Sequence, residues 1–132
     1  MSIFPNSNRH SDQGDIGIAW AIKWFMTNGY TVCLPITEQQ DFDLVVVQRQ
    51  EPALKVQVKT TSNVKPSGHF NVQLRTCGGN RTTFASKNFD RCMADVVFIT
   101  TAAGVSYLIP RNEITATTNL TLNDEWNQWR VG

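Results

Sequence analysis

The sequence predicts an α+β domain in which one N-terminal helix packs on a mixed β-sheet. A long apolar segment followed by a glycine comes first, and short β-branched or alternating segments follow it. The two clearest strands are neighbours, at residues 42–47 and 54–60, and the break between them is rich in turn formers and charge. The 132 residues suit a single domain with one core, and no internal repeat is evident.

The beginning of the chain predicts a loose arm and then the helix. Residues 1–10 are polar and include a proline, which is typical of a chain end without regular structure. Ser11 or Asp12 is a suitable N-cap, and Gly29 stands where glycine commonly follows a helix. We therefore expect a helix over residues 13–28.

This helix is apolar on nearly every side, so we expect the sheet to cover one face and a second subunit to cover another. Trp20 and Trp24 are four residues apart and form one stripe along it. The stripe suits either the core or a dimer contact.

The rest of the chain predicts further short strands, each bounded by turn formers or proline. They lie at residues 30–34, 70–74, 94–100 and 105–109. Residues 111–114 favour a short helical turn. The C-terminal extension, residues 115–132, begins with a segment rich in Thr and Asn that has no clear pattern. Asn123 is a suitable cap for a final short helix at residues 124–130.

Composition limits the possible partners of the protein. Twelve Lys and Arg against eleven Asp and Glu give a net charge of +1, so a polyanion would need a local basic patch. Cys33, Cys77 and Cys92 have no metal-binding spacing and are typical of small apolar residues in a reducing compartment. No leader or membrane-spanning apolar segment is present, so we expect a cytoplasmic protein without membrane contact.

The two neighbouring strands carry the candidate chemistry. Residues 54–59 alternate strictly, so Gln57 and Lys59 share one face of their strand. Antiparallel pairing with the preceding strand would bring Asp43 to that face. A carboxylate suits Mg²⁺, an amide adds a neutral oxygen, and an ammonium can hold a phosphate oxygen or stand beside an attacking water.

These residues resemble the motifs of the PD-(D/E)XK nuclease superfamily. Asp43 stands at the acidic position of the first motif, although Phe42 replaces the proline. Gln57-Val58-Lys59 matches the second motif, with Gln in place of the usual acid, as among group I intron-associated homing endonucleases. The resemblance covers about residues 11–114. It implies a restriction-endonuclease-like mixed sheet with the N-terminal helix packed on it and a short C-terminal helix.

The N-terminal helix carries a further part of the resemblance, Gly14-Asp15-Ile16-Gly17-Ile18. The intron-associated group has an acidic residue, usually Glu, directly after the second glycine, and this chain has Ile18 there. Asp15 lies three residues earlier on the same helix face and can supply that carboxylate. Alternatively, Asp15 is a first-turn acid favoured by the helix dipole. The segment that begins with Asp95 and continues to a Tyr-Leu-Ile-Pro strand also resembles this group, and we expect Asp95 to be structural.

Spaced cations predict where DNA would be contacted. The irregular segment at residues 75–88 combines glycines, small hydrogen-bond donors and basic side chains, which suits phosphate and base-edge contacts. An ordinary surface loop is the alternative. The expected DNA-binding residues are Lys65, Arg75, Arg81, Lys87 and Arg91.

The resemblance implies a Mg²⁺-dependent endonuclease acting on double-stranded DNA, most like an intron-associated homing enzyme. Asp43, Gln57 and Asp15 would hold the metal, and Lys59 would complete the catalytic set. Cutting two strands with one site per chain implies a homodimer or homotetramer. A Holliday-junction resolvase or a restriction-type nuclease is the alternative on the same fold. A non-catalytic DNA-binding module with a decayed nuclease core is another, favoured by Ile18 and the neutral Gln57. The third is a small assembly protein that oligomerises through its apolar helix.

Overall fold

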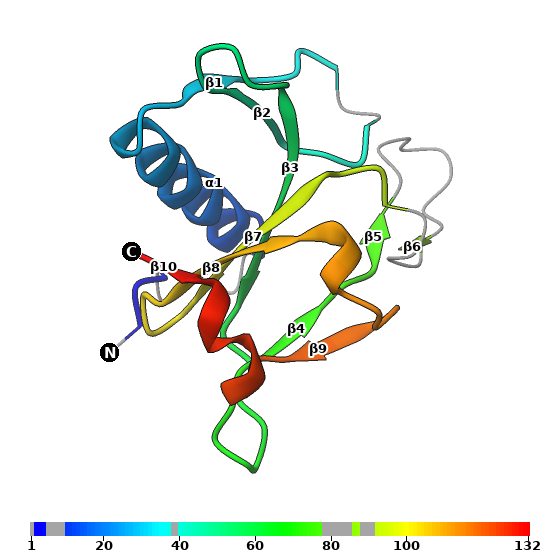
Figure 1. Cartoon of the computed structure of the whole chain (residues 1–132). Coiled ribbons are helices and arrows are strands. Elements are labelled where there is room, and N and C mark those ends of the chain that lie inside the picture. The colour runs from blue at the N-terminus through cyan, green and yellow to red at the C-terminus, as the bar shows by residue number, and fades with distance from the viewer. Residues whose placement is uncertain (1, 5–9, 38–39, 78–85, 88–91) are drawn as a thin grey trace.

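The computed structural model describes residues 2–4, 10–37, 40–77, 86–87 and 92–132 of the chain. In this part of the molecule, one α-helix, α1 (His10–Thr27), packs on a six-stranded sheet with the order β1-β2-β3-β7-β8-β10 (Figure 1). The strands of this sheet are β1 (Thr31–Cys33), β2 (Leu44–Val47), β3 (Leu54–Thr61), β7 (Val96–Thr101), β8 (Ser106–Pro110) and β10 (Arg130–Val131).

Two short ribbons and two 3₁₀ helices complete the described elements. The ribbons pair β4 (Asn71–Gln73) with β9 (Asn119–Thr121), and β5 (Thr76–Cys77) with β6 (Ser86–Lys87). The 3₁₀ helices are η2 (Arg111–Glu113) and η3 (Asp124–Trp129). Among the described residues, α1 is not long and apolar enough to cross a membrane, and neither is any other helix.

The main sheet is mixed, as the sequence predicts. β2 runs antiparallel to β3, with Leu44 opposite Val56, and β3 runs parallel to β7, with Val58 opposite Phe98. The remaining pairs, β1–β2, β7–β8 and β8–β10, are antiparallel. A parallel pair needs a long connection, and the chain between β3 and β7 supplies it with β4, β5 and β6.

Several predicted elements differ from the structure. The helix begins at His10, so Ser11 and Asp12 lie inside it and neither is its N-cap. Asp12 instead places a negative charge in the first turn, which the helix dipole favours. The predicted C-terminal helix is a 3₁₀ helix, in which the spacing of Trp126 and Trp129 stacks both on one side. The cap at Asn123 is confirmed, because its side chain accepts a hydrogen bond from the backbone of Glu125.

The strand predicted at residues 70–74 exists as β4, but it pairs with β9 outside the main sheet. β9 lies in the segment without a clear pattern, and β10 begins at Arg130, the last residue of the predicted final helix. Alternation of apolar and polar residues identifies a half-buried strand but not its partner. The sequence therefore predicted β4 as a strand without predicting the sheet that contains it.

The core has two parts, one on each side of the main sheet. Ala21 and Phe25 of α1 pack against Leu44, Val46, Val56 and Phe98, all completely buried. The opposite face of the sheet packs against the β4–β9 ribbon and the C-terminal segment through Val72, Leu74, Val97, Ile99, Ile109, Leu120 and Leu122. The outer side of α1 is open to solvent in the single chain, with Met26 62% exposed. The second cover predicted for α1, by another subunit, stays a prediction.

Gly17 sets how closely α1 approaches β3. A Cβ atom built on Gly17 would lie 2.2 Å from Cγ2 of Thr60 and 3.5 Å from Cγ1 of Val58. Rotation of the Thr60 side chain away from Gly17 would break a hydrogen bond, because its hydroxyl accepts from Gln13 at 3.1 Å. Gly14, one turn earlier, has nothing within 4 Å of the same position.

The two glycines therefore predict opposite effects of the same substitution. We expect Gly17→Ala to lower the free energy of unfolding by about 1–3 kcal/mol, because the methyl group overpacks the helix–sheet contact. We expect Gly14→Ala to raise it by about 0.5–1 kcal/mol, since alanine favours the helix and meets no neighbour. Urea unfolding of both variants measures the difference. Equal effects of the two substitutions would show that α1 does not depend on this close approach.

Candidate active site

Asp43 lies where the β2–β3 pair ends. Its backbone N–H donates to the carbonyl of Val56 at 2.8 Å, directly before β2 begins. Leu44, the next residue, is buried beneath α1, so the Asp43 side chain points to the opposite face. There its Oδ2 atom accepts hydrogen bonds from the backbone N–H of Val58 at 2.8 Å and from Nε2 of Gln57 at 3.1 Å. The predicted meeting of Asp43 and Gln57 is thus present in the structure.

Lys59 lies on the same face of β3, two residues after Gln57. Its Nζ atom donates to the backbone carbonyl of Arg75 at 3.2 Å. Burial raises the pKa of Asp43, and the positive charge of Lys59 offsets part of this rise. β2 and β3 therefore bring an acid, an amide and an amine to one face, the face opposite α1.

Burial raises the pKa of Asp43 above its ordinary value. The hydrogen bond from Val58 and the charge of Lys59 oppose this effect but do not cancel it. A desolvated carboxylate gains from a cation that lies close to it, so the electrostatics of the site favour cation binding.

The donor atoms suit a hard divalent cation. Within the described part of the chain, Oδ1 of Asp43 makes no hydrogen bond, and Oε1 of Gln57 is approached only weakly, by the thiol of Cys92 at 4.0 Å. Beside the carboxylate opens a recess of about 230 Å³, lined by Pro35, Thr37, Gln40, Phe42 and Asp43. The described residues contain no cluster of three or more His, Cys, Asp or Glu. The protein oxygens placed for an ion are therefore few, which leaves room for oxygens of a bound substrate.

Comparison with known proteins decides the family. The sequence profile described as PD-(D/E)XK endonuclease matches residues 8–130, nearly the whole chain. The chain belongs to this family. Asp43, Gln57 and Lys59 converge in space in a member of this family, and their assignment to its motif stays a prediction.

A solved structure shares the fold of this PD-(D/E)XK chain. It is the bacterial homing endonuclease I-Ssp6803I, which matches with a TM-score of 0.72 and 21% identity over 94% of this chain and 88% of that one. At this identity the likeness establishes the restriction-endonuclease-like α+β fold. No curated protein sequence matches the chain significantly.

The structure does not bring Asp15 to Asp43, Gln57 and Lys59. Asp15 is exposed on α1, and α1 packs on the face of the sheet opposite Gln57. Ile18, at the position where the resemblance leads one to expect an acid, packs against the apolar cluster beneath the helix. A metal-binding role for Asp15 stays a prediction.

Asp95 has the structural role expected for it. Its Oδ2 atom accepts a hydrogen bond from the backbone of Lys55, and its own N–H donates to the Lys55 carbonyl, both at 2.8 Å. Asp95 thereby joins the beginnings of β3 and β7, the parallel strands at the centre of the PD-(D/E)XK sheet.

The structure describes some of the predicted DNA-binding cations but not all of them. Lys65 is exposed in the loop between β3 and β4, and its Nζ atom donates to Oγ1 of Thr121 at 3.1 Å. Arg75 is exposed two residues after the end of β4. The backbone of Lys87 pairs with Thr76, whereas Arg81 and Arg91 lie outside the described residues.

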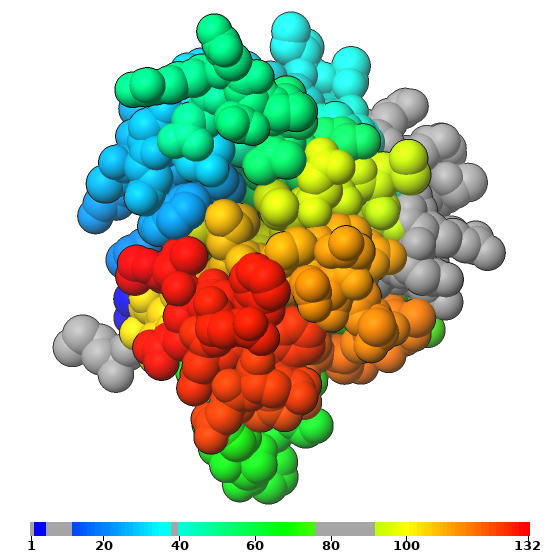
Figure 2. All heavy atoms as spheres, viewed as in Figure 1, coloured from blue at the N-terminus to red at the C-terminus, as the bar shows by residue number. Residues whose placement is uncertain are grey.

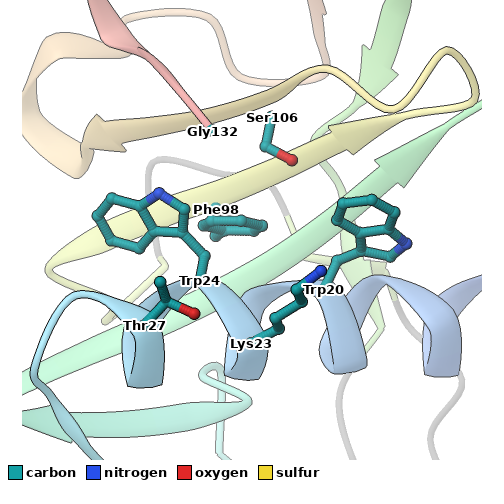
Figure 3. A pocket seen from close by; sticks show the side chains of 7 residues that line it. All are labelled: Trp20, Lys23, Trp24, Thr27, Phe98, Ser106 and Gly132. Carbon is teal, nitrogen blue, oxygen red and sulfur yellow. The ribbon is translucent and has the colours of Figure 1, made fainter.

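A second recess lies on the α1 side of the sheet, away from the motif residues. Figure 3 shows Trp20 and Trp24 reaching from α1 toward Phe98, and Ser106 and Gly132 line the same space of about 190 Å³. Trp24 packs edge-on against Phe25, with ring centroids 5.0 Å apart, and also contacts Phe98. Trp24 therefore belongs to the core in the single chain, and a dimer contact at this stripe stays a prediction.

Two neighbours of Gln57 and Lys59 were not predicted. Cys92, only 8% exposed, faces the amide of Gln57, and the carbonyl of Arg75 binds Lys59. The first lies 35 residues from its partner and belongs to no motif. The second is a backbone atom, which every residue type possesses, so no sequence signal identifies it.

The raised pKa of Asp43 predicts how a neutral replacement behaves. Folding favours the protonated carboxyl group, so its charged form costs stability when the pH exceeds the folded pKa. Asparagine is neutral at every pH, and its oxygen can still accept from Val58 and Gln57. We expect metal-free Asp43→Asn to melt at a higher temperature than the wild type at neutral pH. This gain should shrink as the pH falls through the Asp43 pKa, where the wild type becomes neutral too.

Thermal unfolding followed by circular dichroism in a chelating buffer, from neutral to acid pH, measures this effect. Asp124→Asn is the matched control, because Asp124 is an exposed acid on η3, away from the β2–β3 junction that holds Asp43. If the stability gain of Asp43→Asn instead grew on acidification, the pKa of Asp43 would not be raised by folding.

Proposed function

We propose that the protein is a Mg²⁺-dependent endonuclease that hydrolyses phosphodiester bonds of double-stranded DNA. The observation that carries the proposal is the convergence of Asp43, Gln57 and Lys59 in a chain of the PD-(D/E)XK endonuclease family. The similar fold of a bacterial homing endonuclease favours a homing-type enzyme over a resolvase or restriction-type enzyme on the same fold.

The residues present suit the following roles. Oδ1 of Asp43 and the amide oxygen of Gln57 would hold the ion, while the N–H of Val58 keeps Oδ2 in place. Bound Mg²⁺ supplies a Lewis acid that offsets the negative charge developing on the phosphate. Lys59 would hold a phosphate oxygen or orient the attacking water, since its ammonium lies close enough to Asp43 to influence its pKa.

We also propose that the enzyme acts as a homodimer or homotetramer. One chain provides one convergence of Asp43 and Lys59, whereas cutting both strands of a duplex needs two sites. Twofold symmetry places two identical sites against the two antiparallel DNA strands. The exposed side of α1, with Met26 and the half-buried Trp20, is the surface we expect such an assembly to use.

Plasmid cleavage in Mg²⁺ or Mn²⁺ tests the proposed activity. We expect Asp43→Asn and Lys59→Ala to reduce cleavage by about 100-fold or more, because each removes a group that stabilises the transition state. Lys55→Ala is the matched control. Lys55 lies on the same strand face, four residues before Lys59, and should be dispensable.

Two results would contradict the proposal. Wild-type protein that binds DNA without cutting any form of it would favour the decayed, non-catalytic module, which Ile18 and the neutral Gln57 also suit. Activity lost equally in Lys55→Ala and Lys59→Ala would remove the argument for a specific site. A comparison of linear duplex, four-way junction and intron-less target then separates the homing, resolvase and restriction alternatives.

The neutral side chain of Gln57 predicts that cleavage needs a higher Mg²⁺ concentration than it would with a carboxylate at this position. A carboxylate at this position adds negative charge beside Asp43, so we expect Gln57→Glu to bind Mg²⁺ more tightly. The Mg²⁺ concentration for half-maximal cleavage should fall by about 10-fold. The metal-free variant should also melt at a lower temperature, because two carboxylates repel each other where an amide donated a hydrogen bond.

Mg²⁺ titration of cleavage and of the melting temperature measures both effects. Gln50→Glu, in the exposed turn before β3, adds the same charge away from the site and serves as the control. An unchanged Mg²⁺ requirement in Gln57→Glu would show that this side chain does not contact the ion.

A further inference from the structure

The β4–β9 ribbon has two chemically different faces. Val72 and Leu120 are directly opposite each other and point into the core. The other face carries Asn71, Gln73, Asn119 and Thr121, with Asn71 opposite Thr121 and Gln73 opposite Asn119. All four are exposed or half-exposed. The outer face of the ribbon is therefore a set of neutral hydrogen-bonding side chains on a rigid support.

This composition is unusual for a strand surface that only meets water. Asn is disfavoured in β-strands, yet two of the four outer residues are Asn. The ribbon borders a recess of about 250 Å³ at the end of β3, whose remaining wall includes Gln13 and residues Thr60 to Asn63. The described residues that line the recess are all Gln, Asn, Ser or Thr. None of them is a carboxylate that would repel a nucleic acid.

The amides are partly organised and partly available. Nδ2 of Asn71 donates to Oδ1 of Asn119 at 3.1 Å, which orients both side chains. The side chains of Gln73 and Asn63 make no hydrogen bond within the described residues. An ordered amide pair beside unsatisfied amides can accept and donate bonds to a ligand without first giving up internal ones.

The ribbon is attached to the strand that carries the proposed catalytic lysine. Nζ of Lys59 donates to the carbonyl of Arg75, two residues beyond β4, and Oγ1 of Thr61 donates to the carbonyl of Asn71 at 2.5 Å. Gln73 lies two residues before Arg75, about 7 Å along an extended chain. The rise of DNA is 3.4 Å per base pair. The separation of about 7 Å along the chain thus corresponds to about two base-pair steps.

We propose that the outer face of the β4–β9 ribbon enters the major groove of DNA and reads base edges next to the cleaved phosphodiester. The inference rests on the proposed DNA substrate and adds the element that recognises it. The major groove admits a two-stranded ribbon, and Asn and Gln form paired hydrogen bonds with adenine. Lys65, on the loop that protrudes at the lower edge of the molecule in Figure 2, binds Thr121 at the end of the ribbon and would contact the phosphate backbone.

The test is a binding selection from a pool of random-sequence duplexes, using the Asp43→Asn chain so that no DNA is cut. Gln73→Ala, Lys65→Ala and the control Gln50→Ala are introduced into this parent. Gln73 and Gln50 are both exposed, and neither side chain forms a hydrogen bond with another residue that the structure describes, so neither replacement threatens the fold. The retained duplexes are sequenced, and affinities are measured at several salt concentrations.

We expect the parent and Gln50→Ala to select the same sequence. Gln73→Ala should lose discrimination by about 10-fold at one or two adjacent positions and keep it elsewhere. Lys65→Ala should weaken binding to all duplexes. The slope of log affinity against log salt concentration should become shallower by about one, because one phosphate contact is lost.

Three results would overturn the inference: no sequence preference in the parent, an unchanged preference in Gln73→Ala, or an equal loss of affinity for every duplex in Gln73→Ala. Failure of the proposed activity is distinguishable from these. Wild-type protein without metal-dependent cleavage, combined with a preference that Gln73→Ala relaxes, would reject the nuclease and keep the reading surface. Absence of any DNA binding by the parent would reject both.

Discussion

The hydrogen bond from the backbone of Val58 to the carboxylate of Asp43 is the interaction on which the fold and the site both depend. The register of β2 and β3 ends at Leu44 and Val56, where the backbone N–H of Asp43 still donates to the Val56 carbonyl. Beyond that point, the Asp43 side chain takes the place of a backbone partner for β3. The acid therefore ends the β2–β3 pairing, and it is held at a defined position because the strand itself donates to it. Burial at this junction also raises the pKa of Asp43 and makes a nearby cation favourable.

The neutral Gln57 follows from the same geometry. Its side chain, 8% exposed, lies within hydrogen-bond distance of Asp43 in a desolvated environment. A second carboxylate there would repel the first in the absence of metal, whereas an amide donates to it. The amide thus avoids this repulsion in the metal-free protein, but it offers less negative charge to bind an ion. Additional oxygens would have to come from the DNA phosphate, which would make ion binding and substrate binding mutually dependent.

The sequence predicted those parts of the structure that local pattern determines. Strict alternation in residues 54–59 placed Gln57 and Lys59 on one face, and the turn before it made pairing with the Asp43 strand the simplest arrangement. Gly29, with φ of +87°, ends the helix as predicted, because glycine reaches that conformation readily. The partner of β4 was not predictable, since β9 has only three residues and lies 48 residues from it, opposite Asn71 and Gln73. The position of Asp15 required knowing which face of the sheet α1 covers, which helical periodicity alone does not determine.

β3 connects the two cores and the two proposed activities. Val56 and Val58 face α1, whereas Gln57 and Lys59 face the other way. One strand therefore contributes both to the core beneath α1 and to the candidate active site. At its far end, Lys59 and Thr61 bind main-chain carbonyls of the segment that contains β4. Main-chain acceptors fix the ribbon relative to β3 whatever its outward side chains are. The surface proposed to read DNA can therefore change its Asn and Gln residues without moving Lys59, which allows new target sequences to arise without loss of the cutting site.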